Sequence, residues 1–410
     1  MKFDTVVLGA GIVGVCVAVH LQRRGRQVAL IDRKQPGNET SFGNAGLIQR
    51  EGVYPYAFPR GLGTLLRYAR NQSPDVRYHA DALLEVAPFL WRYWRNSHPA
   101  KHAEIAKSYA TLIEHCVSEH RALAAAAHAS DLLRPIGWIK VFRSAAARDA
   151  ETRLAEQWQR EYGVEFETLD APRLQQLEPD LDKRLQGGLR YPQADSVNDP
   201  NALVNAYARY FEALGGRFYN GDADTLREGW QVDTLEGTLS ASSAVVALGP
   251  WSGRVCERLG YRLPLAVKRG YHMHYAPRQT AQLNHPVLDV EHGYVLAPMA
   301  RGIRLTTGAE IARAEAAKTP VQLDAVEPIA RTLFPLGERL DAEPWMGRRP
   351  CTPDMMPMIG AAPKHRGLWF AFGHAHHGLT LGPVTGRLLA EMMTGEPTLV
   401  DPLPFRVERF

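Results

Sequence analysis

The sequence FDTVVLGAGIVGVCVAVHLQRRGRQVALIDRK, residues 3–34, is a long apolar run that three glycines interrupt and an acidic residue follows. An export signal would need a basic leader, an unbroken apolar core and a small-residue cleavage site. This run begins after Asp4, has no such site and passes directly into the basic sequence QRRGR. A membrane-spanning helix of about 20 residues would also tolerate three close glycines poorly. Neither a signal nor a membrane anchor explains the glycines.

A strand, a tight turn, a helix and a second strand do explain them. TVVLGA is typical of a buried strand, GVCVAVHLQRR has helical length and ends at Gly25, and QVALID is typical of a second strand. Gly9 would permit the turn, Gly11 would let the backbone approach a pyrophosphate, and Gly14 would let helix and strand pack closely. Asp32 follows Gly14 by 18 positions, close to the roughly 20 expected for an acid that binds a ribose hydroxyl. The pattern predicts a dinucleotide site, with a glycine-tolerant buried unit of the same shape as the alternative.

The bulk composition narrows the class of protein. A chain of 410 residues allows one to three domains with a large core. The net charge is only +4 and no lysine-rich run occurs, so a nucleic-acid partner is not indicated. The four cysteines are scattered without a CxxC pair. This pattern predicts reduced thiols, no metal site and a cytoplasmic location.

The rest of the chain alternates between helical and strand-like segments. A long loop rich in Gly, Asn, Ser and Pro occupies residues 38–61, and helical patterns follow from about 80 to 130. NDPNALVNAYARYFEALGG has the start and stop signals of a helix, and residues 262–310 alternate like antiparallel strands. WFAFGHAHHGLTLGPVTGRLLAEMMTG again predicts strand, glycine-rich turn and helix. We therefore expect a nucleotide-binding α/β domain interleaved with an α+β domain that bears an antiparallel sheet.

Four separated segments carry a family resemblance: VVLGAGIVG…VALID, ETSFGNAGLI, VVALGPWSG with the upstream DSVNDP, and WMGRRPCTPDMMPMIG…FGHAHHGLTLGPVTG. Together they span almost the whole chain and resemble the FAD-dependent D-amino-acid oxidase superfamily, most closely the bacterial D-amino-acid dehydrogenases and hydroxyproline dehydrogenases. The resemblance implies a Rossmann-like FAD-binding domain of residues 1–85, 198–252 and 345–410, and a substrate domain of residues 86–197 and 253–344. It also implies non-covalent FAD, because Gly347 occupies the position at which some relatives attach the flavin to a cysteine, and Cys351 does not align with it.

Cofactor contacts are implied in several of these segments. In TSFGNAG, Gly43 and Gly46 would free the backbone to run close to a flat ligand, with an ordinary turn as the alternative. In FGHAHHGLTLGP, Gly373 and Gly378 would aim backbone N–H groups and a helix N-terminus at the pyrimidine edge of the flavin. A small-residue contact to adenine would fall at about Ala223. The implied cofactor contacts are Gly9, Ala10, Gly11, Ile12, Val13, Gly14, Asp32, Arg33, Ser41, Asn44, Ala45, Gly46, Leu47, Ala223, Gly249, Gly373, His374, Gly378, Leu379 and Thr380.

The candidate substrate contacts lie in two other segments. In similar enzymes an arginine directly before the proline of MGRRP binds the substrate carboxylate, and here that residue is Arg349; its planar guanidinium suits a carboxylate. Arg348 departs from the family's usual apolar residue, so an exchange of roles stays open, as does a solvated arginine. Tyr271 and His272, in KRGYHMHY, fall on a strand that in relatives contributes a tyrosine over the active site.

Three histidines stand within four positions of the C-terminal glycine-rich turn. A single histidine would more often be structural, whereas this cluster predicts that at least one of them contacts cofactor or substrate. His376 is the catalytic candidate among them.

The implied reaction is the oxidation of an amine α to a carboxylate, by hydride transfer from the α-carbon to flavin N5. An apolar site would help to keep the amine neutral, so no dedicated base is required. We expect a D-amino or imino acid of the D-alanine, D-proline or hydroxy-D-proline type as substrate, and a quinone or other respiratory-chain acceptor. An oxygen-using amino acid or sarcosine-type oxidase, an NAD(P)-dependent dehydrogenase and an inactive escort protein of the same fold remain alternatives.

FLWRYWRNSHPAKH, residues 89–102, combines aromatic and basic residues at helical spacing. Such a helix is typical of peripheral contact with a membrane, here the inner membrane, where electrons would pass to a quinone. The alternative is that Trp91, Tyr93 and Trp94 pack against the helices of the substrate domain.

Overall fold

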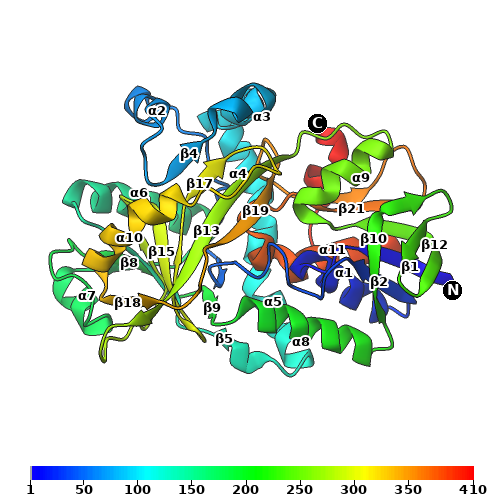
Figure 1. Cartoon of the computed structure of the whole chain (residues 1–410), viewed down its shortest axis with the longest axis horizontal. Coiled ribbons are helices and arrows are strands. Elements are labelled where there is room, and N and C mark those ends of the chain that lie inside the picture. Colours follow the sequence, from blue (N-terminus) through cyan, green and yellow to red (C-terminus); the bar gives the residue numbers. More distant parts are fainter. Residues whose placement is uncertain (1) are drawn as a thin grey trace.

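Five parallel strands form the core of the first of two large sheets in the computed structural model, which describes residues 2–410 (Figure 1). Their carboxyl ends meet at one edge, where α/β sheets bind their ligands. An antiparallel strand, β20 (Met358–Ala361), extends the sheet beside β21, and β11 (Gln231–Thr234) pairs antiparallel with both β10 and β12. The parallel strands, in spatial order, are β10 (Arg217–Arg227), β2 (Val28–Asp32), β1 (Lys2–Leu8), β12 (Gly237–Val246) and β21 (Leu368–Phe372).

Helix α1 (Ile12–Gln22) follows β1 and is buried on almost every side. It crosses α11 (Gly378–Thr394) so closely that a Cβ at Gly386 would lie 2.6 Å from the backbone of Cys16. α8 (Pro200–Ala213) packs on α1, and Asp199 caps it by accepting a hydrogen bond from the Ala202 amide at 2.9 Å. In the described part of the chain, no helix combines the length and the apolar character that crossing a membrane requires. The apolar character of α1 is therefore that of a buried core helix.

The second large sheet centres on the long strand β13 (Ala266–Pro277). The antiparallel pairing of β13, β15 and β16 confirms the alternation seen in residues 262–310. Besides β13 the path contains β4 (Val76–Tyr78), β17 (Ala309–Ile311), β16 (Gly302–Thr306), β15 (Tyr294–Met299), β14 (Val287–Asp289), β6 (Trp138–Val141), β8 (Gly188–Tyr191) and β7 (Glu167–Leu169), while β18 (Leu336–Arg339) and β19 (Trp345–Cys351) pair with β13.

The remaining elements surround these two sheets (Figure 1). Three short strands, β3 (Leu47–Ile48), β9 (Asp195–Val197) and β5 (Leu133–Arg134), form a small separate sheet. The other helices are α2 (Leu62–Ala69), α3 (Leu83–Asn96), α4 (Pro99–Glu114), α5 (Cys116–Ala126), α6 (Ala145–Tyr162), α7 (Ala171–Leu177), α9 (Ser252–Arg258) and α10 (Val321–Leu333).

Two strands and two helices pack across the expected domain boundaries. β4 and β19 lie in segments that we assigned to the FAD-binding domain, but both pair within the second sheet. Conversely, α4 and α5 lie in a segment assigned to the substrate domain, yet they pack on α11. The alternation of a strand indicates which face is buried and does not indicate its partner, so these exchanges were not visible in the sequence. The division into two interleaved domains stays a proposal with these segments exchanged.

Helix α3 matches neither of the two alternatives completely. Phe89 and Tyr93 are buried, as packing inside the protein requires. Trp91 is 59% exposed and stacks on Trp94 with ring centroids 5.1 Å apart. In Figure 1, α2 and α3 project together from one edge of the molecule.

Candidate active site

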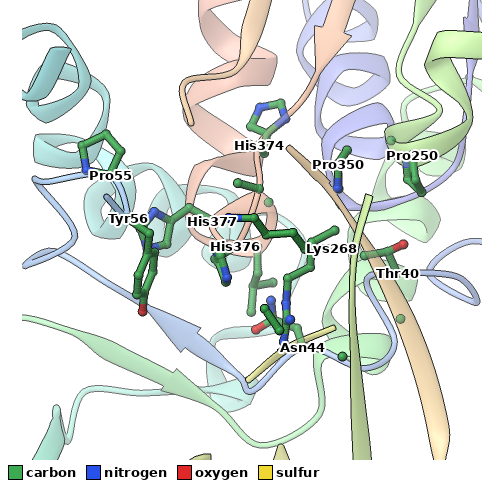
Figure 2. A pocket seen from close by; sticks show the side chains of 18 of the residues that line it. Thr40, Asn44, Pro55, Tyr56, Pro250, Lys268, Pro350, His374, His376 and His377 are labelled. Carbon is green, nitrogen blue, oxygen red and sulfur yellow. The ribbon is translucent and has the colours of Figure 1, made fainter. Parts of the chain in front are cut away.

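A cavity of about 1260 Å³ is lined by residues of both large sheets. Pockets for small ligands usually measure about 300–1,000 Å³, so this one has room for a dinucleotide and a small substrate. One end lies at the carboxyl ends of β1, β2 and β12. The other lies beside β13, β19 and the turn that precedes α11 (Figure 2).

The glycine-rich turn after β1 forms the first end. Gly9 has φ = 107°, and a Cβ there would lie 2.4 Å from the Ala247 carbonyl oxygen. A Cβ at Gly14 would lie 1.8 Å from the Gly9 carbonyl oxygen, which explains why helix and turn can pack so closely. Gly11 caps α1 without a side-chain hydrogen bond, and a Cβ there would approach only the Ser41 hydroxyl, at 3.4 Å. The positive N-terminus of α1 therefore opens into the cavity, an arrangement that favours phosphate.

Asp32 orients this turn. Its carboxylate accepts hydrogen bonds from the Ala10 amide at 2.7 Å and from the Lys34 amide at 3.0 Å. Burial is the largest effect on its pKa and raises it above the ordinary value. Nearby, the Arg33 guanidinium lies 4.5 Å from the centre of the Trp251 ring. Asp32, Arg33 and Ala223 all line this end of the cavity, as an adenosine site would require.

In the loop 41–47, both predicted glycines lie against segments that are distant in the sequence. A Cβ at Gly43 would lie 1.8 Å from the Trp345 ring, so this glycine makes room for a tryptophan. Gly46 has φ = 72°, does not line the cavity, and a Cβ there would lie 2.1 Å from the Val197 carbonyl oxygen. Gly43 also lines the cavity. The segments that pack on the two glycines, around Val197 and Trp345, are far away in the sequence.

The turn between β21 and α11 presents its three histidines differently. His374 is hydrogen-bonded through Nε2 to the Thr385 hydroxyl at 2.9 Å, and His377 through Nδ1 to the Tyr109 hydroxyl at 2.6 Å. Burial lowers the pKa of His374 to about 3 and that of His377 to about 4, so both rings are neutral at pH 7. Nε2 of His377 is buried without a partner among the described residues.

His376 is the histidine that faces the cavity without a hydrogen bond from the described residues (Figure 2). Its ring lies 4.5 Å from that of Tyr56, centroid to centroid. Burial lowers its pKa well below the ordinary value, and the charges of Arg349 and Lys268 lower it further. A neutral imidazole at this place can donate to a ligand or accept from one.

Arg349 extends from β19 into the cavity. Its Nη1 donates to the carbonyl oxygens of Gly308 at 2.9 Å and Arg269 at 3.3 Å, and its Nη2 donates to that of Thr307 at 3.3 Å. The guanidinium lies over Gly270, where a Cβ would be only 2.6 Å from it.

No carboxylate of residues 2–410 contributes to the pKa of Arg349, which burial lowers. A half-buried cation that only carbonyl oxygens hold still lacks an anion. Arg348, one position earlier on the strand, donates to the Ala314 carbonyl at 2.9 Å and does not line the cavity.

Two predicted substrate contacts have other surroundings. Tyr271 borders the cavity, but its hydroxyl donates to Glu310 at 2.9 Å and accepts from Arg269 at 2.7 Å. His272 does not line the cavity; its ring stacks on that of Trp345 with centroids 4.8 Å apart. Besides Tyr271, the residues of the same strand that line the cavity are Lys268 and Gly270.

Tyr56, Glu51 and Lys268 also line the cavity, and we did not predict them from the sequence. Glu51 and Tyr56 lie in the long loop whose Gly and Pro content pointed only to irregular structure. Lys268 precedes Tyr271 by three positions in KRGYHMHY, and strand alternation could have separated the two faces. No pattern in the sequence around Lys268 indicates that this face of the strand lies beside Arg349.

The remaining predicted residues sort by whether they reach the cavity. The cofactor candidates that line it are Gly9, Gly11, Ile12, Val13, Asp32, Arg33, Ser41, Asn44, Ala45, Leu47, Ala223, Gly249, His374, Gly378 and Leu379. The cofactor candidates that do not line the cavity are Ala10, Gly14, Gly46, Gly373 and Thr380. The Thr380 hydroxyl donates a hydrogen bond to the carbonyl oxygen of Leu47, a lining residue, at 3.1 Å. The cavity fits FAD in three respects: two helix N-termini reach it, an acidic residue lies at the end of β2, and its volume exceeds that of the usual pocket.

One group of the described residues could hold a metal ion. It consists of His272, His274 and Asp341, whose ring nitrogen and carboxylate oxygen atoms lie within 4.8 Å of one another. His274 is already hydrogen-bonded on both sides, to Asp341 at 2.7 Å and to the Arg304 guanidinium at 3.0 Å. The positive charge of Arg304 opposes a second cation at this place.

Comparison with known proteins agrees with this geometry. A family model described as FAD dependent oxidoreductase matches residues 4–392. The chain is 30% identical to a D-amino-acid oxidase of Bradyrhizobium diazoefficiens, covering 98% of each chain, and 32% identical to a D-amino acid dehydrogenase of Cereibacter sphaeroides, covering 99% of this chain and 95% of the relative. Among solved structures, glycine oxidase from Geobacillus kaustophilus superposes with a TM-score of 0.75 at 23% identity, covering 100% and 99% of the two chains, and shows the same fold.

Proposed function

The chain belongs to the FAD-dependent oxidoreductase family and is an FAD-dependent amino acid oxidoreductase, and from this premise we propose that its substrate is a D-amino or imino acid. The observation that carries the proposal is Arg349, a half-buried guanidinium without a counter-anion in the cavity that the glycine-rich turn also enters. The names of the relatives above, a D-amino-acid oxidase and a D-amino acid dehydrogenase, support the D configuration. D-Alanine, D-proline and hydroxy-D-proline are the simplest members of this class.

Arg349 would bind and orient the substrate. Two of its nitrogens already donate to main-chain carbonyls, which fixes the plane of the guanidinium. Its Nε–H and one Nη2–H remain for two parallel hydrogen bonds to a carboxylate. FAD, when bound, supplies the two-electron acceptor for the hydrogen on the α-carbon.

The same part of the cavity favours a neutral substrate amine. Lys268 and Arg349 both line it, and neither is paired with an acid in the described chain. Two nearby positive charges lower the pKa of a bound ammonium group, so its proton passes to solvent more easily before oxidation. The neutral His376 ring and the Tyr56 ring lie beside each other in this cavity and would exclude water from one side of the substrate.

Anaerobic mixing of the yellow protein with a panel of D-, L- and N-methyl amino acids tests the substrate proposal. D-Amino or imino acids should bleach the absorption of the bound flavin, and their L enantiomers should not. Failure of every D-amino and imino acid to bleach it would contradict the proposal.

We further propose that the reduced enzyme passes its electrons to a quinone. The proposal rests on the projecting edge formed by α2 and α3, where Leu66, Leu84 and Trp91 are exposed beside Arg92 and Arg95. Exposed apolar side chains next to arginines suit the surface of an anionic membrane. Steady-state turnover should therefore be faster with a short-chain ubiquinone than with air-saturated buffer, and hydrogen peroxide formation at the same rate would identify an oxidase.

Flotation with liposomes tests the membrane contact separately. The holoenzyme should float with vesicles that contain phosphatidylglycerol and stay behind with neutral phosphatidylcholine vesicles, and Trp91→Ser should reduce flotation. Equal recovery from both kinds of vesicle, or none from either, would contradict this contact.

A further inference from the structure

Two cations face each other across a pair of strands in the active-site cavity. In the register of β13 and β19, Lys268 stands directly opposite Arg349. Opposed residues of an antiparallel pair project from the same face of the sheet, and like charges in such a pair are destabilising. Both side chains line the cavity.

The two charged ends point to different places. The Arg349 guanidinium lies over Gly270, two positions along β13, and donates to the Gly308 carbonyl at 2.9 Å. The Lys268 ammonium lies 4.1 Å from the centre of the Tyr93 ring, on helix α3. Figure 2 shows Lys268 in the same cavity as Tyr56, His376 and His377.

Lys268 has no anionic partner within residues 2–410. The residue is only 8% exposed, and none of the hydrogen bonds of the described residues uses its ammonium group. The neighbouring charge that opposes it is that of Arg349. An aromatic face stabilises a cation only partly, so three donors remain for an acceptor that the chain does not provide.

We propose that Lys268 binds a second anionic group of the substrate, and that the enzyme prefers amino acids whose side chain ends in a carboxylate. This inference rests on the proposed function, in which Arg349 binds the α-carboxylate. If both cations served one carboxylate, their charged ends would be expected to converge, whereas one lies over Gly270 and the other over Tyr93. A dicarboxylate would neutralise the pair.

Equilibrium binding of inert acids tests this without turnover. The oxidised holoenzyme is titrated with glutarate, which has the two carboxylates of glutamate and no amine, and with pentanoate, which has one. The change in the visible flavin spectrum gives each Kd. Glutarate should bind at least about tenfold more tightly than pentanoate, the ratio expected for one hydrogen-bonded charge pair.

Variants assign the preference to Lys268. Lys268→Met should remove the preference for glutarate and leave the Kd of pentanoate within about twofold, while Lys268→Arg should retain it. Arg348→Met is the matched control, because that cation lies on the same pair of strands outside the cavity, and it should change neither Kd. The ligand-free flavin spectrum and the thermal midpoint of each holoenzyme show that the fold is intact.

Two results would overturn the inference: an equal affinity of the wild-type protein for both acids, or an equal weakening of both by Lys268→Met. Reductive half-reactions then extend the test to D-glutamate and D-norvaline. Lys268→Met should slow both, because it removes a positive charge near the amine, and should slow D-glutamate more strongly by at least about tenfold. If no D-amino acid reduces the flavin while the glutarate preference still depends on Lys268, the proposed function fails and the second anion site stands.

Discussion

Arg349 is a half-buried charge to which the described chain gives hydrogen-bond acceptors and no anion. Carbonyl oxygens of Arg269, Thr307 and Gly308 hold the guanidinium without neutralising it. Removing one partner of a buried, hydrogen-bonded charge pair usually costs about 2–5 kcal/mol. The site is therefore prepared for a carboxylate before a substrate arrives.

Arg349→Met should lower kcat/KM for D-amino acids by about 10²- to 10³-fold, because the α-carboxylate would lose its charge partner. Arg349→Lys should recover only part of the loss, since an ammonium cannot form two parallel hydrogen bonds. Stopped-flow reduction of the flavin measures both variants. Arg348→Met is the control, and a comparable loss there would show that the two arginines exchange roles.

His20 gives a second prediction at the scale of one residue. It is 4% exposed, its Nε2 has no partner among the described residues, and burial lowers its pKa to about 3. The unfolded chain takes up a proton near pH 6.5 and the folded chain does not, so this residue destabilises the protein as pH falls toward about 3.

The free energy of unfolding of His20→Leu, relative to wild type, should therefore increase by up to about 1.4 kcal/mol per pH unit below pH 6. Urea titrations of the FAD-saturated proteins at pH 7.5, 6.0 and 5.0 measure it. Above pH 7.5 the difference should be constant. A difference that is constant across the whole range would contradict the burial argument.

At the scale of elements, the crossing of α1 and α11 brings the two helix N-termini to the cavity. Gly386 is the point of closest approach, and a Cβ there would lie 2.6 Å from the Cys16 backbone. Close crossings of this kind depend on the missing side chain, and adding a methyl group to a packed core typically costs about 1–3 kcal/mol.

Gly386→Ala should lower the free energy of unfolding by about 1–3 kcal/mol and weaken FAD retention, because both N-termini would shift. Gly63→Ala is the matched control: it lies within α2, a Cβ there would have no atom within 4 Å, and it should stabilise the helix by up to about 1 kcal/mol. Denaturant titration and gel-filtration loss of flavin absorbance measure the two effects. An equal free energy of unfolding and equal FAD retention in the two variants would contradict the close crossing of α1 and α11.

Elements were predictable where the signal is local. The turn at Gly9, the helix start at Asp199 and the turn before α11 all depend on neighbours in sequence. The assignment of His272 to the substrate stays a prediction; its ring stacks on that of Trp345, on another strand, which no local pattern indicates. The cation pair of Lys268 and Arg349 depends on the register of two strands that are about 80 residues apart, and no local pattern specifies such a register.

At the scale of the whole molecule, the cavity contains none of the four cysteines. Cys16, Cys116, Cys256 and Cys351 are buried free thiols, and none of them lines it. FAD held only by hydrogen bonds, charge and packing should dissociate when the protein unfolds.

Precipitation with trichloroacetic acid should therefore leave a colourless pellet and a yellow supernatant that contains intact FAD. A yellow pellet would show a covalent bond to the chain and would contradict the expectation drawn from Gly347. As a control, the protein is denatured by heat at neutral pH. Release of FAD there too shows that the acid did not break a labile covalent bond between FAD and the chain.

The order of the segments around the cavity has a consequence for biosynthesis. The glycine-rich turn at Gly9 is translated more than 350 residues before the turn at His374–Leu379, and both line the cavity. β1 itself pairs with β12, which in turn pairs with β21, so its sheet is incomplete until both have left the ribosome. A nascent polypeptide without β21 and α11 has an incomplete FAD site, and we expect it to retain the cofactor only after both elements have left the ribosome.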